Sequence, residues 1–180
     1  MVLKLTEIAR RTLEAYFEGK QFELDEETKK QFEEKKASFV TLTLNKNGDL
    51  RGCVGSLEAN KELWKDIQEN ALNAAFKDTR FQALEKKELN KVEIEVSVLS
   101  TPERLEFENT EELLRKITNK MGIILKKGFL SATFLPQVWN QIQSKQKFLE
   151  QLSIKAGLNK DAWKEKDAKF FYYYVDLETE

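Results

Sequence analysis

The chain has 180 residues, with 30 Lys and Arg against 31 Asp and Glu, one Cys and no His. The absence of His excludes Ser-His-Asp and Cys-His catalysis and any His-ligated zinc or non-haem iron site. A single Cys cannot ligate an iron–sulfur cluster or build a Cys-rich zinc site within the chain. The net charge of -1 argues against a strongly basic nucleic-acid-binding protein. Any general base that the chain supplies must therefore be Asp, Glu, Lys, Tyr or a thiolate.

The length predicts one domain over residues 1–180, and 41% hydrophobic residues can supply its core. No stretch of the sequence approaches the roughly 18 apolar residues of a membrane span, and no signal-peptide pattern opens it. The lone Cys allows no internal disulfide. We therefore expect a cytoplasmic protein that does not act at the membrane.

The N-terminal third of the sequence predicts a helix and then a hairpin. Apolar residues at helical spacing cover residues 5–17, and Gly19 is suited to ending that helix. The charge-dense segment 23–37 is typical of an exposed loop or helix face. In residues 39–58, two strand-like runs flank Asn47-Gly48, a dipeptide that favours the positive φ of a hairpin turn.

The middle of the chain predicts a helix followed by a half-buried strand. Residues 61–76 have helical periodicity, with Asn60 as the expected N-cap. Residues 92–99 alternate strictly between apolar and other side chains, which is the pattern of a strand with one buried face. The residues expected to face the core from the helix are Leu63, Ile67, Ala71, Ala74 and Ala75.

The C-terminal third continues the mixture of helices and hairpins. Its expected elements are a helix at about 110–119, a hairpin turning at Lys127-Gly128, a helix starting near Pro136, a helix over 144–156 capped by Gly157, and one last strand over 170–177. No repeating βαβ period occurs. This arrangement predicts the α+β class, with a mostly antiparallel sheet and flanking helices.

The segment LRGCVGS, centred on the only Cys, is the densest candidate for chemistry. Gly52 and Gly55 would let the backbone bend or let a ligand approach closely. In a regular strand Arg51 and Cys53 share a face, and a guanidinium beside a thiol favours the nucleophilic thiolate. Cys53 and Arg51 are therefore the candidate catalytic residues, with Ser56 as a donor. The alternative interpretation is a small buried Cys between two bulge glycines of an ordinary sheet.

Two further clusters of charged residues allow a functional and a structural interpretation. Asp78, Arg80 and Phe81 follow the helix and could line a cleft, or they could form an ion pair at a helix end. Glu93 and Glu95 could bind Mg²⁺, or they could form a solvated strand face. The sequence contains no phosphate loop, dinucleotide fingerprint or zinc spacing, so we expect no cofactor and no metal site.

The segment around Cys53 resembles the hallmark of the AMMECR family, Leu-Arg-Gly-Cys-Ile-Gly-Thr/Ser, with Val54 in place of Ile. Thr79 stands where prokaryotic members often have Pro, which weakens the expectation of a rigid turn there. The resemblance runs from about residue 5 to residue 177, and four further blocks follow the family's order: 74–81, 95–99, 132–139 and 155–158.

The resemblance implies two unequal lobes with the Arg-Gly-Cys segment near a cleft between them. Prokaryotic relatives are named component A of the AmmeMemoRadiSam system, alongside a Memo-like protein and a radical S-adenosylmethionine protein. The first hypothesis is therefore an accessory component that acts with these partners. The second is an enzyme that uses Cys53 as nucleophile or thiol carrier in the interlobe cleft. An RNA-binding module is the third, and the net charge disfavours it. The expected cleft residues are Gly52, Gly55, Ser56, Asp78, Arg80 and Phe81.

Overall fold

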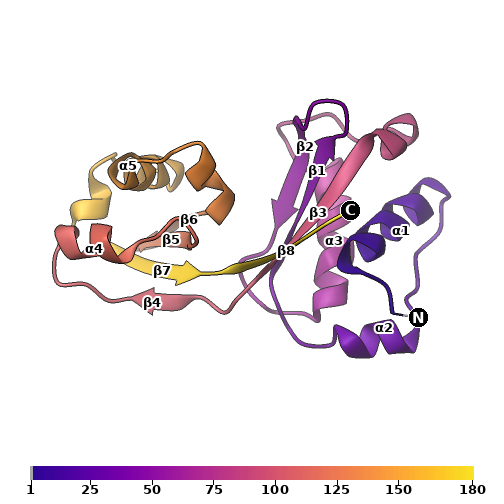
Figure 1. Ribbon diagram of the computed structural model, residues 1–180, viewed down its shortest axis with the longest axis horizontal. Helices are drawn as coiled ribbons and strands as arrows, with labels where there is room; N and C mark the ends of the chain where they lie inside the picture. Colours follow the sequence, from indigo (N-terminus) through magenta and orange to yellow (C-terminus); the bar gives the residue numbers. More distant parts are fainter. Residues whose placement is uncertain (1) are drawn as a thin grey trace. The chain divides into compact units, whose positions relative to one another are not determined.

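The computed structural model describes residues 2–180, which form two compact units (Figure 1). Residues up to 99 together with 176–180 make the N-terminal unit, and residues 100–175 make the C-terminal unit. Each unit combines helices with its own four-stranded sheet, and every strand pair with a described register is antiparallel. The predicted α+β class is therefore confirmed. Within residues 2–180, the helices are all too short or too polar to cross a membrane.

The N-terminal unit packs helices on one face of a sheet with the strand order β2-β1-β3-β8. Its strands are β1 (Ser38–Leu44), β2 (Leu50–Gly55), β3 (Val92–Leu99) and β8 (Val175–Thr179). Its helices are α1 (Leu5–Phe17), α2 (Glu26–Gln31), α3 (Leu63–Phe76) and the 3₁₀ helix η1 (Lys86–Lys91).

The core of the N-terminal unit lies between the sheet and helices α1 and α3. Val40 and Leu42 of β1 and Ile94 of β3 are fully buried there with Ile67 of α3, because alternate strand residues share a face. All five residues predicted to face inward from α3 are buried. Gly48 turns the β1–β2 hairpin with a φ of 71°, a conformation that costs glycine no Cβ clash. The predicted helix over 5–17, the hairpin turning at Asn47-Gly48 and the strand over 92–99 are confirmed.

Strand β2 contains an irregularity that the alternating pattern does not predict. Gly52 pairs with Leu42, but the next pair is Leu50 with Thr43, so Arg51 is an extra residue without a partner. A β-bulge of this kind reverses the facing of the residues beyond it. Leu50 is consequently 39% exposed, although the alternation of a regular strand would place it on the core-facing side with Val54.

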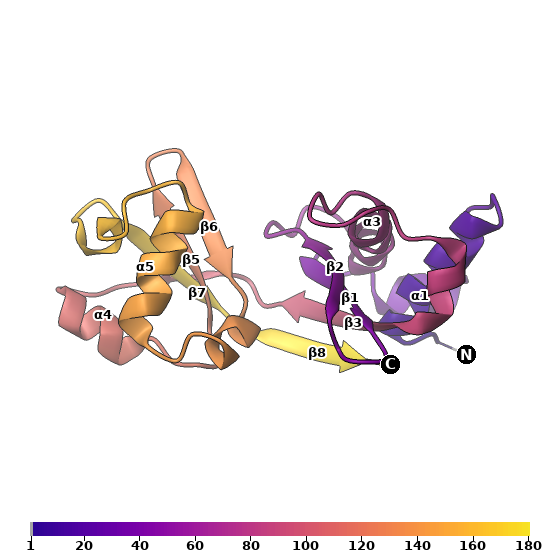
Figure 2. The same ribbon diagram turned by 90° about the horizontal axis from the view of Figure 1, so that it is seen from above.

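The C-terminal unit has a second sheet with the strand order β4-β7-β5-β6, covered by short helices (Figure 2). Its strands are β4 (Glu103–Leu105), β5 (Gly122–Lys127), β6 (Leu130–Phe134) and β7 (Lys169–Tyr173). Its helices are α4 (Thr110–Lys116), α5 (Lys145–Lys155) and the 3₁₀ helices η2 (Pro136–Asn140) and η3 (Ala162–Lys164). In its core, the Trp139 ring stacks on Phe148 with centroids 3.7 Å apart.

The predicted last strand is two strands that belong to different sheets. Strand β7 ends at Tyr173, and β8 begins at Val175. Between them, the Tyr174 amide donates to the Ser100 hydroxyl at 3.0 Å, and its carbonyl accepts from the Ser100 amide at 2.9 Å. An unbroken strand-forming sequence carries no sign that its pairing partners change. The single-strand prediction over 170–177 is therefore wrong at Tyr174.

The start of α3 also differs from its prediction. The helix begins at Leu63, and Glu62 occupies the N-cap position without a capping side-chain bond. The Asn60 side chain donates instead to Glu58 Oε2 at 3.1 Å. Asn60 lies outside the helix and its capping role is not observed.

Candidate functional site in the N-terminal unit

The residues singled out around Cys53 all lie in the N-terminal unit. Strand β2 carries the first group, and the loop after α3 carries the second. The two groups comprise Arg51, Gly52, Cys53, Gly55 and Ser56, and then Asp78, Arg80 and Phe81.

The two glycines of the motif are sites of close packing within the chain. A Cβ at Gly52 would overlap the carbonyl oxygen of Ala74 and lie 3.1 Å from its carbonyl carbon. A Cβ at Gly55 would overlap the Phe39 ring and the Ser38 carbonyl oxygen. Helix α3 and the β1 backbone therefore approach β2 where only glycine fits. The close approach anticipated at these glycines is made by the protein itself.

Cys53 lies on the sheet face opposite the helices, and its side chain is partly buried. The Thr41 hydroxyl donates to Cys53 Sγ at 3.3 Å. Thr41 is the register partner of Cys53 on one side and of Glu95 on the other. One row across three strands thus places a hydroxyl, a thiol and a carboxyl side chain on this face.

Asp78 and Arg80 bind the exposed backbone edge of β2 at Cys53. The Cys53 amide donates to Asp78 Oδ2 at 2.9 Å, and Arg80 Nη2 donates to the Cys53 carbonyl at 3.3 Å. The two side chains also form an ion pair at 2.7 Å. Because β2 is an edge strand, this pair occupies hydrogen-bonding groups that another strand would otherwise take. The structure therefore brings Asp78 and Arg80 to Cys53.

Phe81 extends this cluster. The Arg80 guanidinium lies 5.4 Å from the centre of the Phe81 ring, within cation–π range. The Phe81 amide donates to the Asp78 carbonyl at 3.1 Å, which closes a tight turn. Thr79 sits inside this turn, so hydrogen bonds rather than a proline ring hold it.

The pKa of the Cys53 thiol is raised above its ordinary value, chiefly because burial disfavours the thiolate. The Thr41 hydrogen bond and the charge of Arg80 act in the opposite direction, but they do not overcome burial. The cation that acts on the thiol is therefore Arg80, not Arg51. The catalytic assignment of Cys53 and Arg51 stays a prediction.

Arg51, the extra residue of the β2 bulge, forms an ion pair with Glu88. Its Nε lies 3.0 Å from Glu88 Oε1, and its Nη1 donates to the Gln82 carbonyl at 2.9 Å. The Arg51 side chain is only 11% exposed. The ion pair with Arg51 lowers the pKa of Glu88. Arg51 thus connects β2 to the segment that leads into η1.

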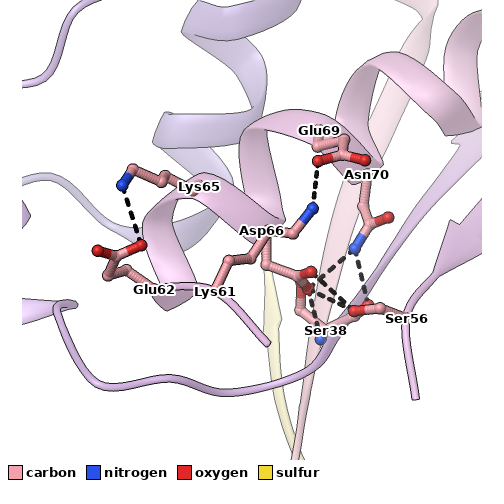
Figure 3. A network of polar contacts seen from close by, with 8 residues as sticks. All are labelled: Ser38, Ser56, Lys61, Glu62, Lys65, Asp66, Glu69 and Asn70. Carbon is pink, nitrogen blue, oxygen red and sulfur yellow. Dashed lines mark hydrogen bonds and ion pairs between the residues drawn. The ribbon is translucent and has the colours of Figure 1, made fainter. Parts of the chain in front are cut away.

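Ser56 belongs to a buried polar cluster at the other end of β2 (Figure 3). Its hydroxyl donates to Asp66 Oδ1 at 2.7 Å, and Ser38 donates to Asp66 Oδ2 through both its amide, at 2.8 Å, and its hydroxyl, at 2.7 Å. Asn70 Nδ2 donates to Asp66 Oδ2 at 2.9 Å and to the Ser38 carbonyl at 3.0 Å. Asp66 is 2% exposed. A buried carboxylate of α3 thereby fixes the ends of β1 and β2.

Sequence reasoning missed Asp66 and Asn70, although a signal for them was present. Counting from Leu63, the two residues fall at the i+3 and i+7 positions of the buried stripe of α3. Polar side chains on such a stripe must find partners inside the protein. Glu88 was missed for a different reason, because the bulge that turns Arg51 toward it leaves no sequence pattern.

Within residues 2–180, no group of three or more Asp, Glu, Cys or His side chains is arranged to hold a metal ion. Glu93 and Glu95 lie opposite Thr43 and Thr41 across the β1–β3 pair. The side chains opposite the two glutamates on β1 are therefore threonines and not a third carboxylate.

The Asp78–Arg80 pair predicts a pH-dependent contribution to stability. The hydrogen bond from Arg80 is the main cause that lowers the pKa of Asp78 from 3.8 to about 2. A depressed folded-state pKa stabilises the fold above about pH 4, and this contribution is lost as the pH falls toward 2. After allowance for the exposure of Arg80, we expect about 1 kcal/mol. Urea unfolding of wild type and Asp78→Asn should show a difference at pH 7 that shrinks as the pH falls from about 4 through about 2; a difference independent of pH would contradict it.

Comparison with known proteins shows the family to which this chain belongs. The AMMECR1 family model matches residues 6–177. The chain belongs to the AMMECR1 family. Protein NEQ441 of Nanoarchaeum equitans is 40% identical over 89% of this chain and 90% of its own length. A protein of Aquifex aeolicus is 35% identical over 99% of this chain and 92% of its own length.

A solved structure shares the fold of this AMMECR1-family chain. The crystal structure of uncharacterized protein PH0010 from Pyrococcus horikoshii matches it with a TM-score of 0.90 and 34% identity. The match covers 98% of this chain and 89% of that one. The two chains therefore share one architecture.

Proposed function

We propose that this AMMECR1-family protein is an accessory component that acts with a Memo-like protein and a radical S-adenosylmethionine protein. These partners come from the resemblance to component A of the AmmeMemoRadiSam system. With no His and one Cys, the chain is poorly equipped for iron–sulfur or His-metal chemistry of its own. In this proposal both units act as one AMMECR-type domain over residues 1–180, in the cytoplasm.

The observation that carries the proposal is that the polar groups of the LRGCVGS segment have partners within the chain. Arg51 binds Glu88, Ser56 binds Asp66, and the Cys53 backbone binds Asp78 and Arg80. Catalytic groups are more often held close to a substrate site with free donors and a pKa near the working pH. Because the polar groups of this segment already have partners within the chain, they support a structural role for the segment. The proposed function is therefore the binding of partner proteins.

The test is direct association between purified proteins. The chain is immobilised, and the folded Memo-like and radical S-adenosylmethionine proteins are applied separately and together in biolayer interferometry. We expect saturable binding of at least one of them, and copurification of the same pair. Absence of binding by both, with circular dichroism showing all three folded, would overturn the proposal.

The alternative is a thiol enzyme, and the observation that favours it is the position of Arg80 beside Cys53. If the raised pKa of Cys53 governs its reactivity, the native thiol reacts with iodoacetamide at pH 7 several-fold more slowly than a free thiol. Arg80→Gln should slow it further, because the charge of Arg80 lowers this pKa. The protein unfolded in urea is the control and should react at the rate of a free thiol. Native alkylation faster than that control would favour the enzyme.

A further inference from the structure

A groove on the N-terminal unit is separate from the Cys53 segment. It has a volume of about 810 Å³ and runs along α3 beside the end of α1 and the segment that follows it. From Glu62 to Leu72, its α3 side rises by about 15 Å at the helical rise per residue. This length matches about three turns of a second helix laid along it.

Aromatic and aliphatic side chains form the apolar part of the groove. Tyr16, Phe22, Trp64 and Leu72 line it. The Tyr16 ring packs on Phe76 in a tilted arrangement with centroids 4.3 Å apart, yet Tyr16 remains 51% exposed. A Tyr held in place and open to solvent is the kind of side chain that anchors a protein interface, because little conformational entropy is lost on binding.

Lysines make the polar part of the groove positive, although the whole chain is slightly acidic. Four lysines and two glutamates line it, and Glu18 just outside the lining pairs with Lys20 at 3.0 Å, which leaves an excess of one positive charge against the chain's net charge of -1. The lysines are Lys20, Lys35, Lys61 and Lys65. Lys65 lies 5.0 Å from the centre of the Trp64 ring, so charge and aromatic surface are adjacent.

The lysine ion pairs in this groove can open for a ligand. Lys65 pairs with Glu62 at 3.0 Å, and Lys61 pairs with Glu69 (Figure 3). The Lys65 side chain is 48% exposed and the Glu69 side chain 57% exposed. Solvent-exposed pairs of this kind contribute little to stability, so a carboxylate from outside can replace the internal glutamate.

We propose that this groove binds an acidic amphipathic segment of a partner protein. Apolar side chains of the segment pack against Tyr16 and Trp64, and its carboxylates bind the lysines. The binding of such a segment is inferred from the groove itself. Its assignment to a Memo-like or radical S-adenosylmethionine partner rests on the function proposed above.

The first experiment uses a defined probe. A 15-residue helical peptide of Leu, Ala and Glu, without aromatic residues, is titrated while the tryptophan fluorescence is recorded, and a peptide with Lys in place of Glu is the matched control. Trp64 is the tryptophan at the groove, whereas Trp139 and Trp163 are buried in the C-terminal unit. We expect a saturable change with the acidic peptide that is absent in Trp64→Phe. Equal responses to both peptides, or none, would overturn the proposal.

The second experiment changes the groove. Lys61→Glu combined with Lys65→Glu should weaken binding of the acidic peptide at least tenfold, and Tyr16→Ser should weaken it severalfold without a change of charge. The control pair, Lys160→Glu with Lys166→Glu, makes the same charge change on exposed residues of the C-terminal unit and should alter binding less than twofold. Circular dichroism verifies folding of each variant. Undiminished peptide binding by both folded groove variants would contradict the proposal.

The same variants separate this inference from the proposed function. If the partner proteins bind wild type and the folded Lys61→Glu/Lys65→Glu variant equally, the groove is not their docking surface and the inference fails, while the accessory function stands. If the acidic peptide binds the groove and neither partner associates, the groove is supported and the partner assignment fails. A nucleotide or short RNA that competes with the peptide at equal concentration would contradict a peptide-specific groove.

Discussion

Gly52→Ala is expected to destabilise the N-terminal unit by about 3 kcal/mol, the upper end of typical overpacking costs. The added Cβ meets the backbone carbonyl of Ala74, which cannot rotate away as a side chain can. Relief requires α3 to move off β2, and the helix carries Ile67, Ala71 and Ala74 of the core. The loss is a large fraction of the roughly 5–15 kcal/mol by which most domains are stable.

The control for Gly52→Ala is Gly48→Ala in the hairpin turn. Gly48 has a φ of 71°, and a Cβ there would meet nothing within 4 Å beyond its chain neighbours, so its cost comes from backbone strain alone. We expect about 1 kcal/mol for it, the cost of placing a residue with a side chain in the left-handed region. Urea unfolding followed by circular dichroism, with hydrogen exchange of the α3 amides, measures both. Equal losses for the two variants would show that α3 does not depend on the contact at Gly52.

Asp66→Ala is expected to cost about 4 kcal/mol, since it leaves several buried donors without an acceptor. The Ser38 amide, the Ser38 and Ser56 hydroxyls and the Asn70 amide all donate to this carboxylate. Asp66→Asn keeps one acceptor oxygen but turns an NH₂ group toward donors, so about 2 kcal/mol is expected. The free energy of unfolding in urea at pH 7 measures each value.

Glu69→Ala is the matched control for Asp66. Glu69 lies on the same helix, and its 57% exposed side chain pairs with Lys61. Removing an exposed ion pair changes stability by less than about 1 kcal/mol. A loss for Asp66→Ala no larger than that for Glu69→Ala would show that the buried cluster does not hold β1 and β2 to α3.

Local patterns in the sequence predict the elements of this fold well. The alternation of Val92, Ile94 and Val96 marks β3, and Asn47-Gly48 marks the turn of the first hairpin. These signals are local, because side chains repeat every second residue along a strand and turns require particular backbone angles. The assignment to the α+β class follows from such elements alone.

Features that depend on distant pairing do not appear in local patterns. The bulge at Arg51 arises from the register between β1 and β2, and the break at Tyr174 arises where the strand changes sheets. The candidate site depends on both kinds of information. The segment around Cys53 is visible in the sequence. The position of Arg80, rather than Arg51, beside the thiol depends on the folding of the loop after α3.

In the proposed function, the Cys53 segment has a structural role in the N-terminal unit and the protein acts by binding partner proteins. The most direct test compares wild type and Cys53→Ser for association with the Memo-like and radical S-adenosylmethionine proteins in interferometry. Serine keeps the approximate size of the side chain and a partner for the Thr41 hydroxyl, but it removes the thiol. We expect saturable binding of the partner proteins by both wild type and Cys53→Ser, and the affinities of the two variants should agree within twofold. Binding that is lost in folded Cys53→Ser, or absent in folded wild type, would contradict it.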